Sequence, residues 1–282
     1  MRRLFTFPCA GETLVGTLDA AAGSTGLLIV TGGNEVRAGA HRGMAMLAAR
    51  LAADGVPVFR YDRRGVGDST GANAGFAGSR EDLLAAAAAF RSAAPQLERL
   101  VGFGNCDAAT TLAWWGREAG CDAVVLANPW VVEPVDALPP AAAIRAHYVA
   151  QLRDPRAWGR IMTRGLSPGK LVRGLRRIVA PVREESLAAR TLAAIADWGD
   201  AATIVLASGD ATAITYADAA RRAGIAPPTV KVETGSHSFA RVGDAAALED
   251  AIRSVVMPAL SRGPAAYAGA TRKARDPGSN PG

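Results

Sequence analysis

Continuous apolar runs alternate with segments of helical spacing along most of this chain. Runs such as GLLIVTGG and RLVGFG are apolar throughout, which is typical of strands buried on both faces of a parallel sheet. The alternation predicts an α/β fold with a mostly parallel central sheet and helices on both faces. The predicted elements are a hairpin at 3–8 and 13–18, strands at 26–33, 56–62, 99–104, 122–129, 202–210 and 229–233, and helices at 42–53, 80–93, 107–118, 214–223 and 244–260.

The alternation stops once, between residues 139 and 195, where the sequence is helical and irregular. We expect this segment to be a cap over the carboxyl ends of the strands, the edge at which open α/β sheets bind ligands. The core would then comprise residues 1–138 and 196–262. The remaining residues, 263–282, are rich in Gly, Pro and Arg, a composition that predicts a disordered tail.

The cysteine content excludes a disulfide framework and a Cys-x-x-Cys metal pair, because the chain has only Cys9, Cys106 and Cys121. No apolar run is long enough to span a membrane. We therefore expect a cytoplasmic protein with no metal and no organic cofactor.

The turn GFGNCDAAT at 102–110 raises the question of a nucleophile. Small residues at Gly104 and Ala108 allow a sharp strand-to-helix turn that would push the thiol of Cys106 out of the sheet. The backbone N–H of Asp107 would face the same space and could stabilise an oxyanion. The alternative is that Cys106 is an ordinary buried cysteine.

A nucleophile needs a base and an acid that orients the base. His237 follows the last predicted strand, and Asp210 follows the strand before it. The order Cys106, Asp210, His237 is that of the α/β hydrolases. Glu133, with Asp136 behind it, is the alternative acid.

A second oxyanion donor is expected from the loop TGGNEVRAGAHRG, which follows the first parallel strand. Glycines there allow the backbone to approach a bound carbonyl closely. The N–H of Gly33 or of Asn34 would be the donor, and the sequence does not distinguish the two. The alternative is a tight turn without a chemical role.

Taken together, these pieces resemble an α/β hydrolase. YDRRGVGDS at 61–69 resembles the D-x-R-G-x-G-x-S loop of the serine aminopeptidase and lysophospholipase-like branch, in which this loop is structural. A narrower resemblance, to the exosortase A system-associated hydrolases of type 1, rests on VTGGNEVRAGAHRG, FRYDRRGVGDS, GNCDAA, NPW, SGDATA and SHSFAR. That family also has Cys at the turn, with Gly at the position of Ala108 and Thr at that of Ser238. The resemblance implies a hydrolase or acyltransferase, with Cys106 as nucleophile, linked to bacterial exopolysaccharide gene systems.

A cysteine nucleophile has its own chemistry, because a thiol of lowered pKa is already a thiolate and forms a thioester intermediate. The expected substrate is thus an acyl ester or thioester, as a small molecule or on an acyl carrier. The rival hypothesis is a non-catalytic binding or scaffold subunit on the same fold.

The predicted cap is strongly basic: residues 139–195 contain eleven Arg or Lys and three acidic residues, in a chain of net charge +6. Arg173, Arg176 and Arg177 lie on the polar side of an amphipathic pattern. They predict binding to an anionic partner, either an acidic carrier or the inner membrane surface. The alternative is a cap helix with a solvated basic back. No nucleic-acid-binding module is recognisable.

Overall fold

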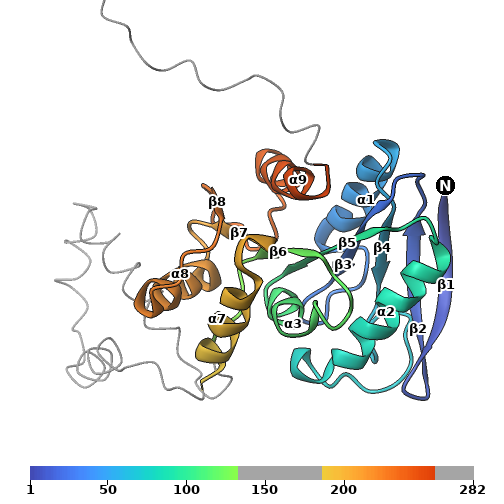
Figure 1. Cartoon of the computed structure of the whole chain (residues 1–282), viewed down its shortest axis with the longest axis horizontal. Helices are drawn as coiled ribbons and strands as arrows, with labels where there is room; N and C mark the ends of the chain where they lie inside the picture. Colours follow the sequence, from blue (N-terminus) through green and yellow to red (C-terminus); the bar gives the residue numbers. More distant parts are fainter. Residues whose placement is uncertain (133–185, 258–282) are drawn as a thin grey trace, which may run out of the picture.

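The computed structural model of the chain describes residues 1–132 and 186–257. These residues form one eight-stranded sheet with the strand order β1-β2-β4-β3-β5-β6-β7-β8 (Figure 1). The strands are β1 (Arg2–Cys9), β2 (Glu12–Asp19), β3 (Thr25–Val30), β4 (Val58–Tyr61), β5 (Arg99–Asn105), β6 (Ala123–Ala127), β7 (Ala202–Ala207) and β8 (Thr229–Val232).

The sheet is antiparallel at one end and parallel elsewhere. β1 and β2 form a hairpin, and β2 pairs with β4 in antiparallel orientation. From β4 to β8 every neighbouring pair is parallel. The predicted fold class is therefore confirmed, and the carboxyl ends of β3, β5, β7 and β8 all lie at one edge.

Helices cover both faces of this sheet (Figure 1). One face packs against α2 (Arg80–Ala93), α3 (Asp107–Trp115), α7 (Leu187–Trp198) and α8 (Ala211–Ala223), and the other against α1 (Gly43–Ala53) and α9 (Val242–Val256). The strands supply both cores because successive side chains point to opposite faces. In β3, Leu28 and Val30 enter the first core, and Leu27 and Ile29 enter the second.

Among the differences between the observed helices and the sequence-based expectations, two concern the starts of α8 and α7. α8 begins at Ala211 rather than at residue 214, because the Asp210 carboxylate caps its first turn by accepting from the N–H groups of Thr212 and Ala213. α7 begins inside the predicted cap, and its buried residues Leu192 and Ile195 pack in the core. The other cap residues up to 185 and the tail from 258 onward lie outside the described residues.

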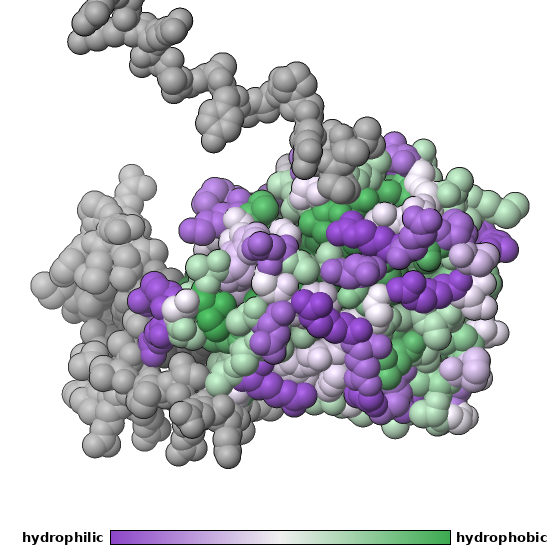
Figure 2. All heavy atoms as spheres, in the orientation of Figure 1, coloured by the Kyte–Doolittle hydropathy of each residue, from purple (hydrophilic) through white to green (hydrophobic). Residues whose placement is uncertain are grey.

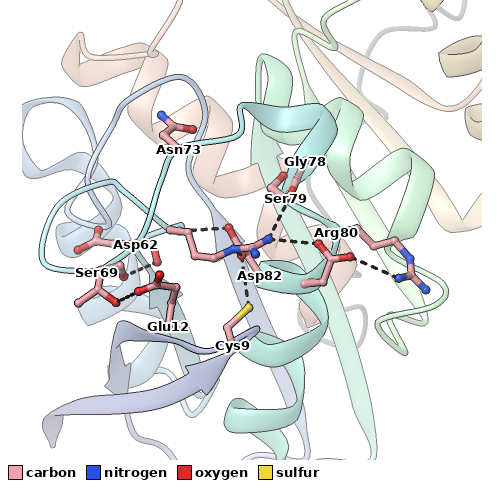
Figure 3. A network of polar contacts seen from close by, with 12 residues as sticks. Cys9, Glu12, Asp62, Ser69, Asn73, Gly78, Ser79, Arg80 and Asp82 are labelled. Carbon is pink, nitrogen blue, oxygen red and sulfur yellow. Dashed lines mark hydrogen bonds and ion pairs between the residues drawn. The ribbon is translucent and has the colours of Figure 1, made fainter.

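The loop after β4 is folded around two buried carboxylates (Figure 3). Asp62 accepts hydrogen bonds from the backbone N–H of Arg37 at 2.6 Å and of Asp68 at 3.1 Å. Asp82, in the first turn of α2, accepts from the backbone N–H of Arg64 at 3.1 Å and from the Cys9 thiol at 3.4 Å. The D-x-R-G loop thus joins the N-terminal hairpin to α2 behind the carboxyl edge of the sheet.

Hydrophilic and hydrophobic residues are intermixed on the face of the molecule shown in Figure 2. Large hydrophobic side chains that are exposed stand apart from one another in sequence, for example Leu4, Met46 and Val230. None of the described helices combines the length and the apolar character that crossing a membrane requires.

Candidate active site

Cys106 occupies a strained turn between β5 and α3. Its backbone has φ 63° and ψ −126°, a conformation that non-glycine residues rarely adopt. Gly104 permits the turn, since a Cβ at that position would lie 2.7 Å from the carbonyl carbon of Ala108 in α3. The thiol is partly exposed, whereas Cys9 and Cys121 are buried. The local geometry is therefore that of a strand–turn–helix elbow.

Asp210 is fixed by the helix that it caps. One carboxylate oxygen, Oδ2, accepts from the N–H groups of Thr212 at 3.0 Å and Ala213 at 3.1 Å. The other, Oδ1, lies 3.0 Å from Nδ1 of His237. Burial alone would raise the pKa of Asp210, but the contacts with His237 and the two N–H groups outweigh it, so the pKa lies below its usual value. The carboxylate is thus ionised and aimed at the imidazole.

His237 lies between a carboxylate and a thiol. Its imidazole hydrogen-bonds to Asp210 and to Cys106, and these two contacts raise the pKa of His237 to about 10 in spite of partial burial. The side chain is 40% exposed, so the ring remains accessible from outside. The structure therefore brings Cys106, His237 and Asp210 into one hydrogen-bonded series, although they are far apart in the chain.

Two asparagines hold the main chain at His237. The side-chain amides of Asn105 and Asn128 donate to the His237 carbonyl at 3.1 Å and 3.2 Å. Asn128 is fully buried, with φ 41°, and its Oδ1 accepts from the N–H of Ala207 at 2.9 Å. Sequence reasoning gave Asn128 no role of its own. The sequence signal that could have indicated a role is a polar residue directly after a buried strand, because a buried amide without hydrogen bonds would destabilise the fold.

The loop after β3 makes a tight turn in which Glu35 N–H bonds to the Gly32 carbonyl at 3.0 Å. Gly33 has φ 56°, and its N–H donates to Oδ1 of Asp107 at 2.8 Å. Among the described residues, no acceptor is found for the N–H of Asn34. The N–H of Asp107 belongs to the first turn of α3, where helix geometry leaves it without an intrahelical partner. The three predicted oxyanion residues therefore lie together, with the N–H of Gly33 already engaged.

Glu35 is a second carboxyl group beside the histidine. Burial raises its pKa, against the lowering effects of the Ala40 N–H, which donates to it at 2.6 Å, and of nearby His237. Glu35 lines a small cavity of ≈ 20 Å³ together with Thr31 and Ser238. A space of that size accommodates water rather than an acyl group.

Several predicted groups lie outside the described residues. These are the alternative acids Glu133 and Asp136 and the basic side chains Arg173, Arg176 and Arg177. Within residues 1–132 and 186–257, no group of three or more His, Cys, Asp or Glu side chains is arranged to hold a metal ion.

Comparison with solved structures identifies α/β hydrolases. The chain is similar to an esterase from Pyrococcus furiosus, with a TM-score of 0.60 and 13% identity, over 91% of this chain and 92% of the other. It is also similar to an α/β serine hydrolase without a lid from Xanthomonas campestris, with a TM-score of 0.56 and 14% identity, over 91% and 95%. A third similar structure is a proline iminopeptidase-related protein from Thermus thermophilus, with a TM-score of 0.55 and 19% identity, over 91% of this chain and 99% of the other. At these identities the likeness concerns the fold.

Comparison by sequence is more specific. Among curated proteins, none is significantly similar to this chain. The family profile described as serine aminopeptidase, S33, matches residues 27–195, which is more than half of the chain and includes Cys106 at the elbow. Asp210 and His237 lie beyond the matched range. The chain belongs to this serine aminopeptidase family of α/β hydrolases, with cysteine at the turn where such enzymes typically carry serine.

Proposed function

We propose that this chain is a cysteine hydrolase or acyltransferase that acts on acyl esters or thioesters. The observation that carries the proposal is the position of His237, whose imidazole contacts both Asp210 and Cys106 at the carboxyl edge of the sheet. A raised histidine pKa favours a thiolate–imidazolium pair, the activated form of a cysteine nucleophile. An inert scaffold on the same fold has no need for this arrangement.

The reaction would proceed in two halves. The Cys106 thiolate attacks the acyl carbon, forming a C–S bond while the carbonyl electron pair moves to oxygen. Collapse of this oxyanion expels the alcohol or thiol, which takes its proton from the His237 imidazolium, and leaves a thioester on Cys106. Water, losing a proton to His237, then attacks that thioester and releases a carboxylic acid and the thiolate. An alcohol, amine or thiol in place of water gives acyl transfer.

Cysteine in place of serine affects both halves of the reaction, the acylation of Cys106 and the release of the acyl group. A thiolate attacks without further deprotonation, so acylation depends less on the base than in a serine enzyme. The thioester intermediate passes readily to nucleophiles other than water. For this reason we propose thioester hydrolysis and acyl transfer beside ester hydrolysis. The link to exopolysaccharide gene systems stays a prediction from resemblance.

A direct test is a screen of p-nitrophenyl esters and acyl thioesters, with the intact protein's mass recorded during turnover. We expect an adduct of acyl mass on the wild-type enzyme, mapped to the peptide containing Cys106. Cys106→Ala should abolish both the adduct and turnover, while the control Cys121→Ala should keep both. A wild-type protein that forms no adduct with any ester or thioester would support the scaffold hypothesis instead.

The basic residues Arg173, Arg176 and Arg177 extend the proposal to an anionic partner. Each such side chain near an anionic surface contributes on the order of 1 kcal/mol, and salt screens the effect. Changing all three to Gln should weaken binding to anionic vesicles or to an acidic acyl carrier protein and reduce its salt dependence. Equal binding by the variant and the wild type, at both low and high salt, would show that these residues do not bind an anionic partner and would support the alternative of a solvated basic surface.

A further inference from the structure

The backbone of Gly33 is held on both sides by charged side chains. On one side, Gly33 N–H donates to Oδ1 of Asp107 at 2.8 Å. On the other, the Arg63 guanidinium donates through Nη2 to the Gly33 carbonyl. The bond to Asp107 fixes Gly33, and the bond from Arg63 fixes the peptide group between Gly33 and Asn34. The remaining hydrogen-bonding group, the N–H of Asn34, is left over.

Arg63 is unusual in having so few partners. It is 2% exposed, and among the described residues neither its Nε nor its Nη1 has a hydrogen-bond acceptor. A buried cation with few acceptors interacts strongly with those it has, because the surrounding dielectric is low. Its interaction with the Gly33 carbonyl polarises that peptide and makes the Asn34 N–H a better donor.

The local sequence is shaped to admit the Asp107 carboxylate. A Cβ at position 32 would lie 2.5 Å from Asp107 Oδ1 and 2.7 Å from the carbonyl oxygen of Asn105. Glycine at 32 is therefore required by the close approach of both the Asn105 backbone and the Asp107 carboxylate. Asn34 is anchored as well, since its Oδ1 accepts from the Asn73 amide at 2.8 Å.

We infer that Asp107 and Arg63 are positioning residues that clamp this loop and leave Asn34 N–H as its donor to the reaction oxyanion. The inference rests on the proposed function, because the oxyanion forms only if Cys106 attacks an acyl carbon. It assigns a role to the Asp107 side chain, next to the nucleophile, that is separate from the role predicted for its backbone N–H.

Two reactions of the same thiol separate this role from a change in the nucleophile. Alkylation of Cys106 by iodoacetamide displaces iodide and forms no oxyanion, whereas acylation by p-nitrophenyl acetate does. The ratio of the two rates therefore reports on the oxyanion donors. Loss of one such donor lowers rates by roughly 10²–10³-fold, which sets the scale of the expected effect.

Asp107→Ala should lower the acylation-to-alkylation ratio by at least about tenfold, because the clamp is lost and the donor is misplaced. Asp107→Asn keeps an acceptor oxygen and should retain a ratio near that of the wild type. Gly32→Ala, whose Cβ would meet both the carboxylate and the Asn105 backbone, should also lower the ratio. The inferred role of Asp107 is wrong if Asp107→Ala leaves the ratio unchanged. It is also wrong if Asp107→Asn lowers the ratio as much as Asp107→Ala does.

Asp122 provides a matched control, since its Oδ2 accepts from the backbone N–H of Leu100 at 2.7 Å, at the opposite end of β5. Asp122→Ala should change thermal stability without changing the ratio. An equal fall of the ratio in this variant would identify a general loss of stability and overturn the inference.

The donor itself is tested at position 34. Asn34→Pro removes the N–H, and Asn34→Ala keeps it while removing the contact with Asn73. We expect a large fall of the ratio in the first variant only. An unchanged ratio in Asn34→Pro would exclude Asn34 N–H as the donor. A wild-type Cys106 that is alkylated but never acylated would refute the proposed function, and this inference with it.

Discussion

Oδ1 of Asp210 lies 3.0 Å from Nδ1 of His237, and the other oxygen of the same carboxylate is held by the first turn of α8. The helix cap therefore fixes the carboxylate, and the carboxylate fixes the imidazole. One short-range interaction, typical of helix N-termini, thus orients the group that contacts Cys106.

Removing the charge of Asp210 should lower the pKa of His237 from its raised value of about 10, because the contact with Asp210 is the largest cause of the shift. Asp210→Asn is the relevant variant, and titration of the histidine ring protons by NMR measures the pKa. Cys106→Ala should lower it too, since the thiol is the second cause. The resonance is assigned by its loss in His237→Gln.

The alternative acid is examined in the same titration. Glu133→Gln should leave the pKa of His237 and turnover nearly unchanged, whereas Asp210→Asn should reduce turnover. If Asp210→Asn changes neither the pKa of His237 nor turnover, and Glu133→Gln lowers both, Glu133 is the acid and the proposed role of Asp210 is wrong.

The raised pKa of His237 also predicts how stability depends on pH. The folded-state value, about 10, lies above the ordinary value of 6.5. The stabilising contribution of the protonated ring is therefore complete below pH 6.5 and is lost as the pH rises toward 10. Urea unfolding of the wild type and of His237→Gln at several pH values measures it. The difference in unfolding free energy between the two should shrink as pH increases, and a constant difference would contradict the ion pair.

Alkylation at neutral pH should select Cys106 among the three cysteines. Burial raises the pKa of the Cys9 thiol to about 11, assisted by its contact with Asp82, and that of Cys121 to about 12. Both therefore remain thiols at pH 7 and react slowly. Peptide mapping after brief treatment with iodoacetamide measures the selectivity. Faster labelling of Cys9 or Cys121 in the folded protein would contradict an activated Cys106.

The D-x-R-G loop should be intolerant of a methyl group at Gly67. This residue has φ 57°, and a Cβ there would lie 2.3 Å from Oδ2 of the buried Asp62. Gly67→Ala combines backbone strain with this clash and should cost about 2–4 kcal/mol of unfolding free energy. Gly11→Ala is the matched control: its φ is 83°, but no atom lies within 4 Å of the added Cβ, so only the strain of about 1–2 kcal/mol remains. Equal losses in urea unfolding would show that the contact with Asp62 is unimportant.

Sequence patterns predicted the sheet and the turn at Cys106 because both depend on local signals. Buried parallel strands are apolar throughout, and the Gly104–Ala108 spacing marks a close strand–helix turn. Cys106, Asp210 and His237 each follow a predicted parallel strand, and these positions together with their order along the chain predicted that the three meet at one edge of the sheet. Their roles in catalysis stay predictions.

Other features depend on contacts between distant segments and left no local signal. The engagement of Gly33 N–H by Asp107 joins residues 74 positions apart, so the sequence could not separate Gly33 from Asn34 as donor. Likewise, Leu192 and Ile195 look like residues of the helical insertion until their packing in the core is seen.

The buried amide of Asn128 has a consequence for the timing of synthesis. Its partners are Asn105 on β5, Ala207 on β7 and His237 after β8, so its hydrogen bonds are complete only when the chain has been made well past residue 237. Domains fold as units while the chain leaves the ribosome from its N-terminus. A nascent chain that has already exposed Cys106 therefore lacks both the histidine that would activate it and the frame that holds that histidine. Under the proposed function, the thiol therefore stays out of acyl chemistry until the segment that follows β8 has been made and has folded.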